Sequence, residues 1–169
     1  METLKKYMLK LLVPGMVLAA GVPVLGQGLT YHLGSPATAE EIRPLDIAIG
    51  PAGKELPPGH GTAQEGAKVY AAKCAVCHGA TGTETLFHTR PLVGGKDERD
   101  VSNYWHATSI WNVINHSMPL NAQRVRTETL SADEVYALTA FLLYRNGIIQ
   151  ESDVIDAKTL PKVQMPSRK

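Results

Sequence analysis

The chain has 169 residues, a length that suits one modest domain with additional terminal segments. It is 44% hydrophobic but only 6% aromatic, so a core built from it needs another source of volume. The formal net charge of +1 argues against a nucleic-acid-binding protein.

The N-terminal segment has the order of regions that marks an exported protein. METLKKYMLK is basic, and the apolar run LLVPGMVLAAGVPVLG that follows is interrupted by proline and glycine and is short for a membrane span. This pattern predicts a signal peptide over residues 1–26, cleaved before Gln27, and hence a periplasmic protein. An uncleaved membrane anchor is the alternative. Cleavage removes three lysines and Glu2, so the net charge falls from +1 to −1.

Residues 27–61 are predicted to form an extended N-terminal arm, because they end in the proline- and glycine-rich stretch PAGKELPPGHG. Thr62 and Glu65 then form a capping box, which predicts a helix from residue 63 to Lys73 and opens a domain over residues 62–147. Gly66 and Tyr70 are four residues apart, so they share the face of this helix that is available to a packed partner.

The stretch KCAVCHG follows this helix and holds the only two cysteines of the chain, Cys74 and Cys77, with His78 directly after them. In an exported protein, the two cysteines could form a disulfide or a thioredoxin-type redox pair. Half of a zinc site is a third reading, but no other cysteine exists to complete it. The spacing C-x-x-C-H favours a fourth reading, one covalently attached haem c, with His78 as the proximal iron ligand.

A second helix is predicted around Ile110, Val113 and Ile114, and the chain breaks after it at Ser117-Met118-Pro119. A thioether held just past a helix end can ligate iron from the face opposite His78, and such ligation raises the reduction potential. We therefore predict Met118 as the distal ligand. The rival candidates are His60, His88, His106, His116 and Met165, of which Met165 is expected to be a packing residue.

A third helix is predicted where Ser131 and Glu134 form another capping box and apolar residues recur with helical period up to Gly147. We expect Leu138 and Phe141 of this helix to pack against Gly66 and Tyr70. Residues 148–169 are predicted to form a C-terminal tail that, like the N-terminal arm, lies along the domain or a partner subunit, with flexible tails as the alternative.

The pattern G-x-x-x-Y-x-x-x-C-x-x-C-H, the later M-P and the final helix together resemble class I monohaem cytochromes c. Three longer stretches, SPATAEEIRPLDIAIGPAGKELPPGHGTAQEG, YWHATSIWNVINHSMPL and LSADEVYALTAFLLYRNGIIQESDVIDAKTLPKVQMPSR, narrow the resemblance. They resemble the cytochrome subunits of periplasmic sulfite dehydrogenases and of sulfane dehydrogenases. The resemblance implies an all-α class I cytochrome c fold, with three to four helices around one covalent haem and extended arms at both ends.

The resemblance also implies a role. Cys74 and Cys77 would carry the haem between the ligands His78 and Met118. The protein would accept electrons from a molybdopterin subunit that oxidises sulfite or a related sulfur compound, and would pass them to a soluble cytochrome c or a terminal oxidase. The chain itself is then expected not to be an enzyme. The alternatives are a free electron carrier, the haem subunit of another periplasmic dehydrogenase, a haem enzyme or gas sensor with an open iron site, and a thiol–disulfide protein.

Overall fold

The computed structural model describes residues 35–42, 48–84, 86, 90–94, 100–121, 123 and 125–168. The predicted signal peptide and its cleavage site before Gln27 lie outside the described residues. Contacts divide the chain into two units, residues 1–39 and 40–169. Helix α2 (Ala39–Ile42), which spans this division in sequence, is one short exposed turn. The fold below is that of residues 48–168.

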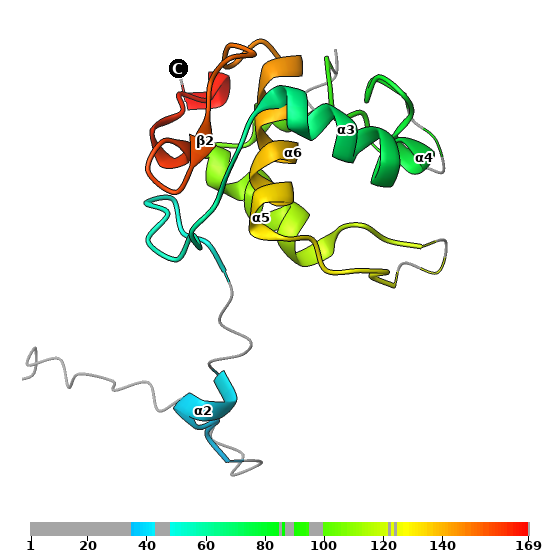
Figure 1. Ribbon diagram of the computed structural model, residues 1–169. Helices are drawn as coiled ribbons and strands as arrows, with labels where there is room; N and C mark the ends of the chain where they lie inside the picture. Colours follow the sequence, from blue (N-terminus) through cyan, green and yellow to red (C-terminus); the bar gives the residue numbers. More distant parts are fainter. Residues whose placement is uncertain are drawn as a thin grey trace, which may run out of the picture. The chain divides into compact units, whose positions relative to one another are not determined.

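Four α-helices occur among the described residues from 48 onward: α3 (Ala63–Lys73), α4 (Ala75–His78), α5 (Ala107–Ser117) and α6 (Ala132–Arg145) (Figure 1). The 3-10 helices are η3 (Val101–Asn103), η4 (Leu160–Lys162) and η5 (Pro166–Arg168), and the strands are β1 (His60–Gly61) and β2 (Ile155–Asp156). This content confirms the predicted all-α class. Within the described ranges, no helix has the length and apolar character that a membrane span requires.

Both predicted capping boxes are present. At the start of α3, the Glu65 carboxylate accepts the backbone N–H of Thr62 at 2.9 Å, while the Thr62 hydroxyl accepts that of Glu65 at 3.3 Å. Ser131 and Glu134 repeat the arrangement at α6, with distances of 2.9 and 3.2 Å. Each box satisfies backbone donors that a helix start leaves without partners, which fixes where the two helices begin.

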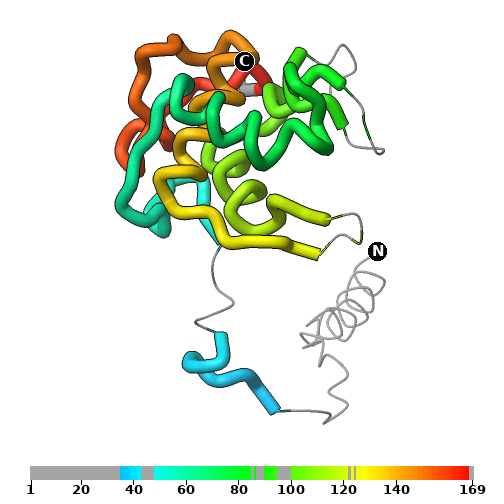
Figure 2. Tube along the Cα trace, turned by 45° about the vertical axis from the view of Figure 1, so that its right-hand side comes forward, coloured from blue at the N-terminus to red at the C-terminus, as the bar shows by residue number. Residues whose placement is uncertain are grey.

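Helix α3 crosses α6 in close contact at Gly66, and both ribbon and trace show the two helices lying across each other (Figures 1 and 2). A Cβ atom at Gly66 would lie 2.7 Å from the Phe141 Cβ and closer still to the backbone carbonyl of Ala137. One turn along α3, the Tyr70 ring packs on Phe141 with 4.9 Å between ring centroids. The predicted packing of Phe141 is confirmed, but the residue nearest Gly66 is Ala137 and not Leu138.

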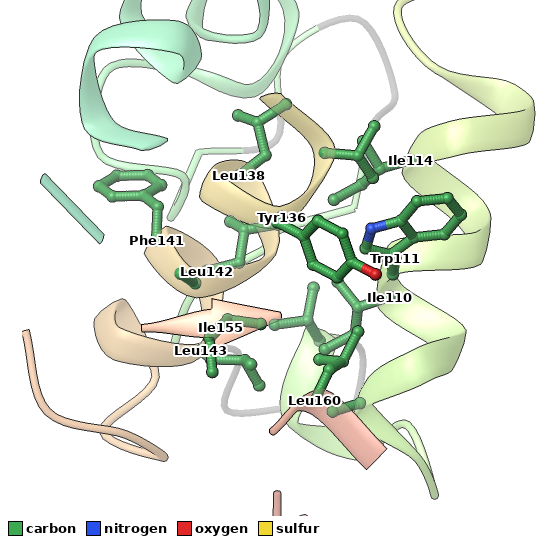
Figure 3. Close-up of a cluster of buried hydrophobic side chains, with 14 of the residues drawn as sticks. Ile110, Trp111, Ile114, Tyr136, Leu138, Phe141, Leu142, Leu143, Ile155 and Leu160 are labelled. Atoms are coloured by element: carbon green, nitrogen blue, oxygen red, sulfur yellow. The ribbon is translucent and has the colours of Figure 1, made fainter. Parts of the chain in front are cut away.

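Helices α5 and α6 enclose the main apolar core (Figure 3). Trp111 of α5 and Tyr136 of α6 meet with 5.6 Å between ring centroids, and both are buried. Ile110 and Ile114 extend this contact along α5, at the helical spacing that the sequence predicted. Val113, the third apolar residue of the predicted stripe, is instead 36% exposed.

The segments on either side of the helices also pack onto this core. Strands β1 and β2 pair antiparallel, with Gly61 opposite Ile155. Leu160 and Met165 are 0% and 1% exposed, and the Tyr136 hydroxyl donates to the Pro57 carbonyl at 2.8 Å. Residues 48–61 and 148–168 therefore lie along the domain, and Met165 is a packing residue. Packing continues across residues 62 and 147, so it marks no domain boundary at either residue. The domain boundaries predicted there stay predictions.

The crossing makes a stability prediction. Gly66→Ala places a methyl group against the α6 backbone, so we expect the free energy of unfolding to fall by about 1–3 kcal/mol. Gly50→Ala is the matched control, because its Cβ would meet only the Glu55 carboxylate at 3.5 Å. Urea unfolding of both variants measures the difference. Equal stability of the two variants would contradict the crossing geometry.

Candidate haem site

One helical turn brings the two cysteines and the histidine together. The Cys74 carbonyl accepts the backbone N–H groups of Cys77 at 3.1 Å and His78 at 3.0 Å, and this winds residues 74–78 into α4. Residues three and four apart share one face of a helix. Cys74, Cys77 and His78, all half-buried, therefore face the same side.

The cysteines are present as thiols and not as a disulfide with each other. Burial raises the pKa of the Cys74 thiol from 9.0 to about 11, which is opposite to the lowered pKa of a redox-active cysteine. The described part of the chain also holds no group of three or more His, Cys, Asp and Glu side chains placed to bind a metal ion. The disulfide, thioredoxin-type and zinc readings thus gain no support here.

The surroundings of the His78 imidazole favour its neutral form. Burial lowers the pKa of its imidazole, and the backbone of Arg90 acts in the opposite direction, so the neutral ring is favoured at pH 7. Its Nδ1 atom is buried and has no hydrogen bond of good geometry within the described structure. Metal-bound histidines usually donate their second ring nitrogen to a backbone carbonyl. The Arg90 backbone is the group placed for this, so the residues present fit a haem.

Tyr70 fixes the end of the motif. It is 2% exposed, and its hydroxyl donates to the Gly79 carbonyl at 3.0 Å, with the His78 carbonyl further away at 3.4 Å. Burial raises the pKa of Tyr70 to about 12, so the phenol stays a donor at neutral pH. Sequence reasoning placed the Tyr70 ring against the partner helix but missed this role of its hydroxyl, for which the sequence carries no local signal.

Met118 comes from a different element. It caps α5, where its backbone N–H donates to the Ile114 carbonyl at 3.2 Å, and its side chain is half-buried. The helix ends here because Pro119 has no N–H to continue it. Helix α4 and the segment after α5 extend to the same side of α6 in both views (Figures 1 and 2). The assignment of Met118 as iron ligand stays a prediction.

The structure describes the surroundings of four of the five rival ligand candidates. The side chain of His60 is 68% exposed beside Asp133, and His106 lies at the start of α5. His116 Nδ1 lies 2.7 Å from the Asn112 carbonyl, although its Nε2 is buried without a partner in the described structure. His88 lies outside the described residues. Met165 is 1% exposed and belongs to the core cluster, as a packing residue would.

Comparison with known proteins agrees with this geometry. The family described as "Cytochrome C oxidase, cbb3-type, subunit III" matches residues 61–142, which include Cys74, Cys77, His78 and Met118. A chain in the crystal structure of the sulfane dehydrogenase SoxCD from Paracoccus pantotrophus is 32% identical, with a TM-score of 0.63. The alignment covers 82% of this chain and 70% of that one. No curated protein matches the chain.

The fold and the motif on α4 thus define a c-type cytochrome that transfers electrons through haem. Within that class, the chain belongs to the class I c-type cytochromes of the Sox type. The resemblance seen in the sequence is thereby confirmed.

The Tyr70 hydroxyl makes a pH-dependent prediction. Tyr70→Phe keeps the ring but leaves the Gly79 carbonyl unpaired, so we expect about 1 kcal/mol less stability at neutral pH. Because the folded-state pKa of about 12 lies above the ordinary value of 10.0, the phenol's contribution is complete below pH 10 and is lost as the pH rises through 12. Tyr70→Phe should therefore lose less stability than the wild type as the pH rises from 10 to 12.

Urea unfolding at a series of pH values measures this effect. Tyr144→Phe is the control, because that side chain lies on the same helix as Phe141 but is 37% exposed. A Tyr70→Phe protein with wild-type stability and wild-type alkaline behaviour would show that the hydroxyl does not hold the turn.

Proposed function

We propose that this protein is a periplasmic monohaem cytochrome that accepts electrons, one at a time, from a molybdopterin dehydrogenase oxidising sulfite or a related sulfur compound. It passes them to the respiratory chain through a soluble cytochrome c or a terminal oxidase. One observation carries the choice of partner, the 32% identity over 82% of the chain to a chain of a sulfane dehydrogenase. Sulfur oxidation itself takes place on the partner, and this chain is not an enzyme.

The roles of the residues follow from their positions. Cys74 and Cys77 would hold one haem c covalently, and His78 and Met118 would ligate its iron. A haem held in this way supplies one-electron redox chemistry. If His78 and Met118 both ligate the iron, no position on it would be left for a substrate, which would favour electron transfer over catalysis or gas sensing. Tyr70 holds the His78–Gly79 turn in place while the charge at the site changes.

Export is part of the proposal. Residues 1–26 act as a signal peptide, and the mature chain begins at Gln27 in the periplasm. The packed terminal segments, residues 48–61 and 148–168, leave the helical side that carries α4 uncovered in both views (Figures 1 and 2). This is the side at which a redox partner would approach the haem.

Reconstitution with the partner tests this function. The purified haem-loaded protein is mixed with sulfite, or with thiosulfate in a parallel arm, with and without the molybdenum protein that co-purifies with it. We expect reduction, followed by the visible spectrum, only when that protein is present. Reduction by a dehydrogenase that does not act on sulfur compounds would instead support the alternative of a general carrier or of a different subunit.

Carbon monoxide binding tests the ligand assignment separately. The reduced wild-type protein should not bind carbon monoxide, because Met118 occupies the sixth position, whereas Met118→Ala should bind it. His116→Ala is the control, and it should behave as the wild type does. Carbon monoxide binding by the reduced wild type would favour an open haem site, as in an enzyme or gas sensor.

A further inference from the structure

A cationic side chain at the end of α3 joins three elements of the site. Lys73, the residue before Cys74, has a side chain that is 25% exposed and lies between two carboxylates. Its Nζ atom is 2.7 Å from Glu128 Oε2 and 2.9 Å from Glu134 Oε1. Glu134 belongs to the first turn of α6, whereas Glu128 belongs to the segment that leads from Met118 to α6. These two ion pairs raise the pKa of Lys73, with Glu128 as the larger cause.

Glu128 is connected to Met118 through a closed loop. We call the described residues 119–121 and 125–127 the Met118 loop. The Thr127 N–H donates to the Pro119 carbonyl at 3.0 Å, and Leu120 pairs with Arg126 in an antiparallel bridge. The Arg126 Nε–H in turn donates to the Glu128 carbonyl at 3.0 Å. These contacts connect Glu128 to Pro119, the residue next to Met118. A displacement of Glu128 would therefore also displace Pro119.

The two glutamates differ in what their ion pairs join. Lys73–Glu134 joins α3 to α6, and these helices are already held together at Gly66. Lys73–Glu128 joins α3 to the segment that carries Met118. If the Met118 loop moves away from the iron, the pair to Glu128 is strained or broken, whereas the pair to Glu134 is unaffected.

We propose that Glu128 is a positioning residue for Met118: its ion pair with Lys73 holds the Met118 loop against the segment that binds the haem. The inference rests on the proposed function in one respect, the assignment of Met118 as the sixth ligand. A thioether is a neutral ligand that external ligands can displace from iron. The ion pair that restrains the Met118 loop therefore affects how easily Met118 is displaced.

Imidazole binding to the oxidised haem-loaded protein tests this directly. In Glu128→Gln the loop opens more easily, so we expect imidazole to bind up to about fivefold more tightly than to the wild type, the usual limit for a partly exposed ion pair. Glu134→Gln is the matched control, because it removes a charge from the same lysine and glutamine still serves in the capping box. That variant should bind imidazole as the wild type does.

Two further measurements separate positioning from a general loss of stability. The double variant Lys73→Gln/Glu128→Gln should bind imidazole no more tightly than Glu128→Gln alone, because each substitution removes the same Lys73–Glu128 ion pair. At about 1 M salt, the difference between the wild type and Glu128→Gln should shrink, since salt screens the pair. Equal effects of Glu128→Gln and Glu134→Gln on imidazole binding would overturn the proposal.

The proposed function fails in a distinguishable way. If Met118→Ala and the wild type bind imidazole with equal affinity, then Met118 is not the sixth ligand, and both the ligand assignment and the role of Glu128 are overturned. If Met118→Ala binds imidazole much more tightly but Glu128→Gln behaves as the wild type does, the ligand assignment stands and only the role of Glu128 is lost.

Discussion

The close crossing of α3 and α6 at Gly66 is the contact on which the haem site depends. Because no side chain separates the two helices there, the next turn of α3 brings Tyr70 onto Phe141, with 4.9 Å between ring centroids. From that position the Tyr70 hydroxyl reaches the Gly79 carbonyl, immediately after the candidate proximal ligand. A bulkier residue at position 66 would displace α3, and with it both cysteines and His78, from the helix against which the site is built.

The structure also explains how a chain with few aromatic residues makes a stable domain. Trp111 and Tyr136 form one aromatic contact between α5 and α6, and the terminal segments cover its surroundings with Ile155, Leu160 and Met165. Much of this packing involves no side chain of the haem motif. The side that carries α4, by contrast, holds Cys74, Cys77 and His78, all half-buried, and under the proposed function a haem would complete this side.

The features that could be predicted from the sequence are those encoded by neighbouring residues. Thr62 and Glu65 mark a helix start because the side chain of each accepts a hydrogen bond from the backbone of the other. Cys74, Cys77 and His78 share a helix face because of their spacing. Contacts between distant segments could be predicted only in part: the helical faces indicated that Tyr70 would pack on Phe141, but most such contacts leave no trace in the neighbouring residues. Gly66 shows that a helix can approach, but not that Ala137 would be the residue it meets. Nothing near Lys73 indicates Glu128, and nothing near Gly61 indicates its pairing with Ile155.

Under the proposed function, one iron is held between the imidazole of His78 and the thioether of Met118. X-ray absorption at the iron edge of the purified haem-loaded protein measures these neighbours directly. We expect one sulfur and five nitrogen neighbours in the wild type, and loss of the sulfur in Met118→Ala. An iron site with no sulfur neighbour in the wild type, or one whose sulfur persists after that replacement, would contradict it.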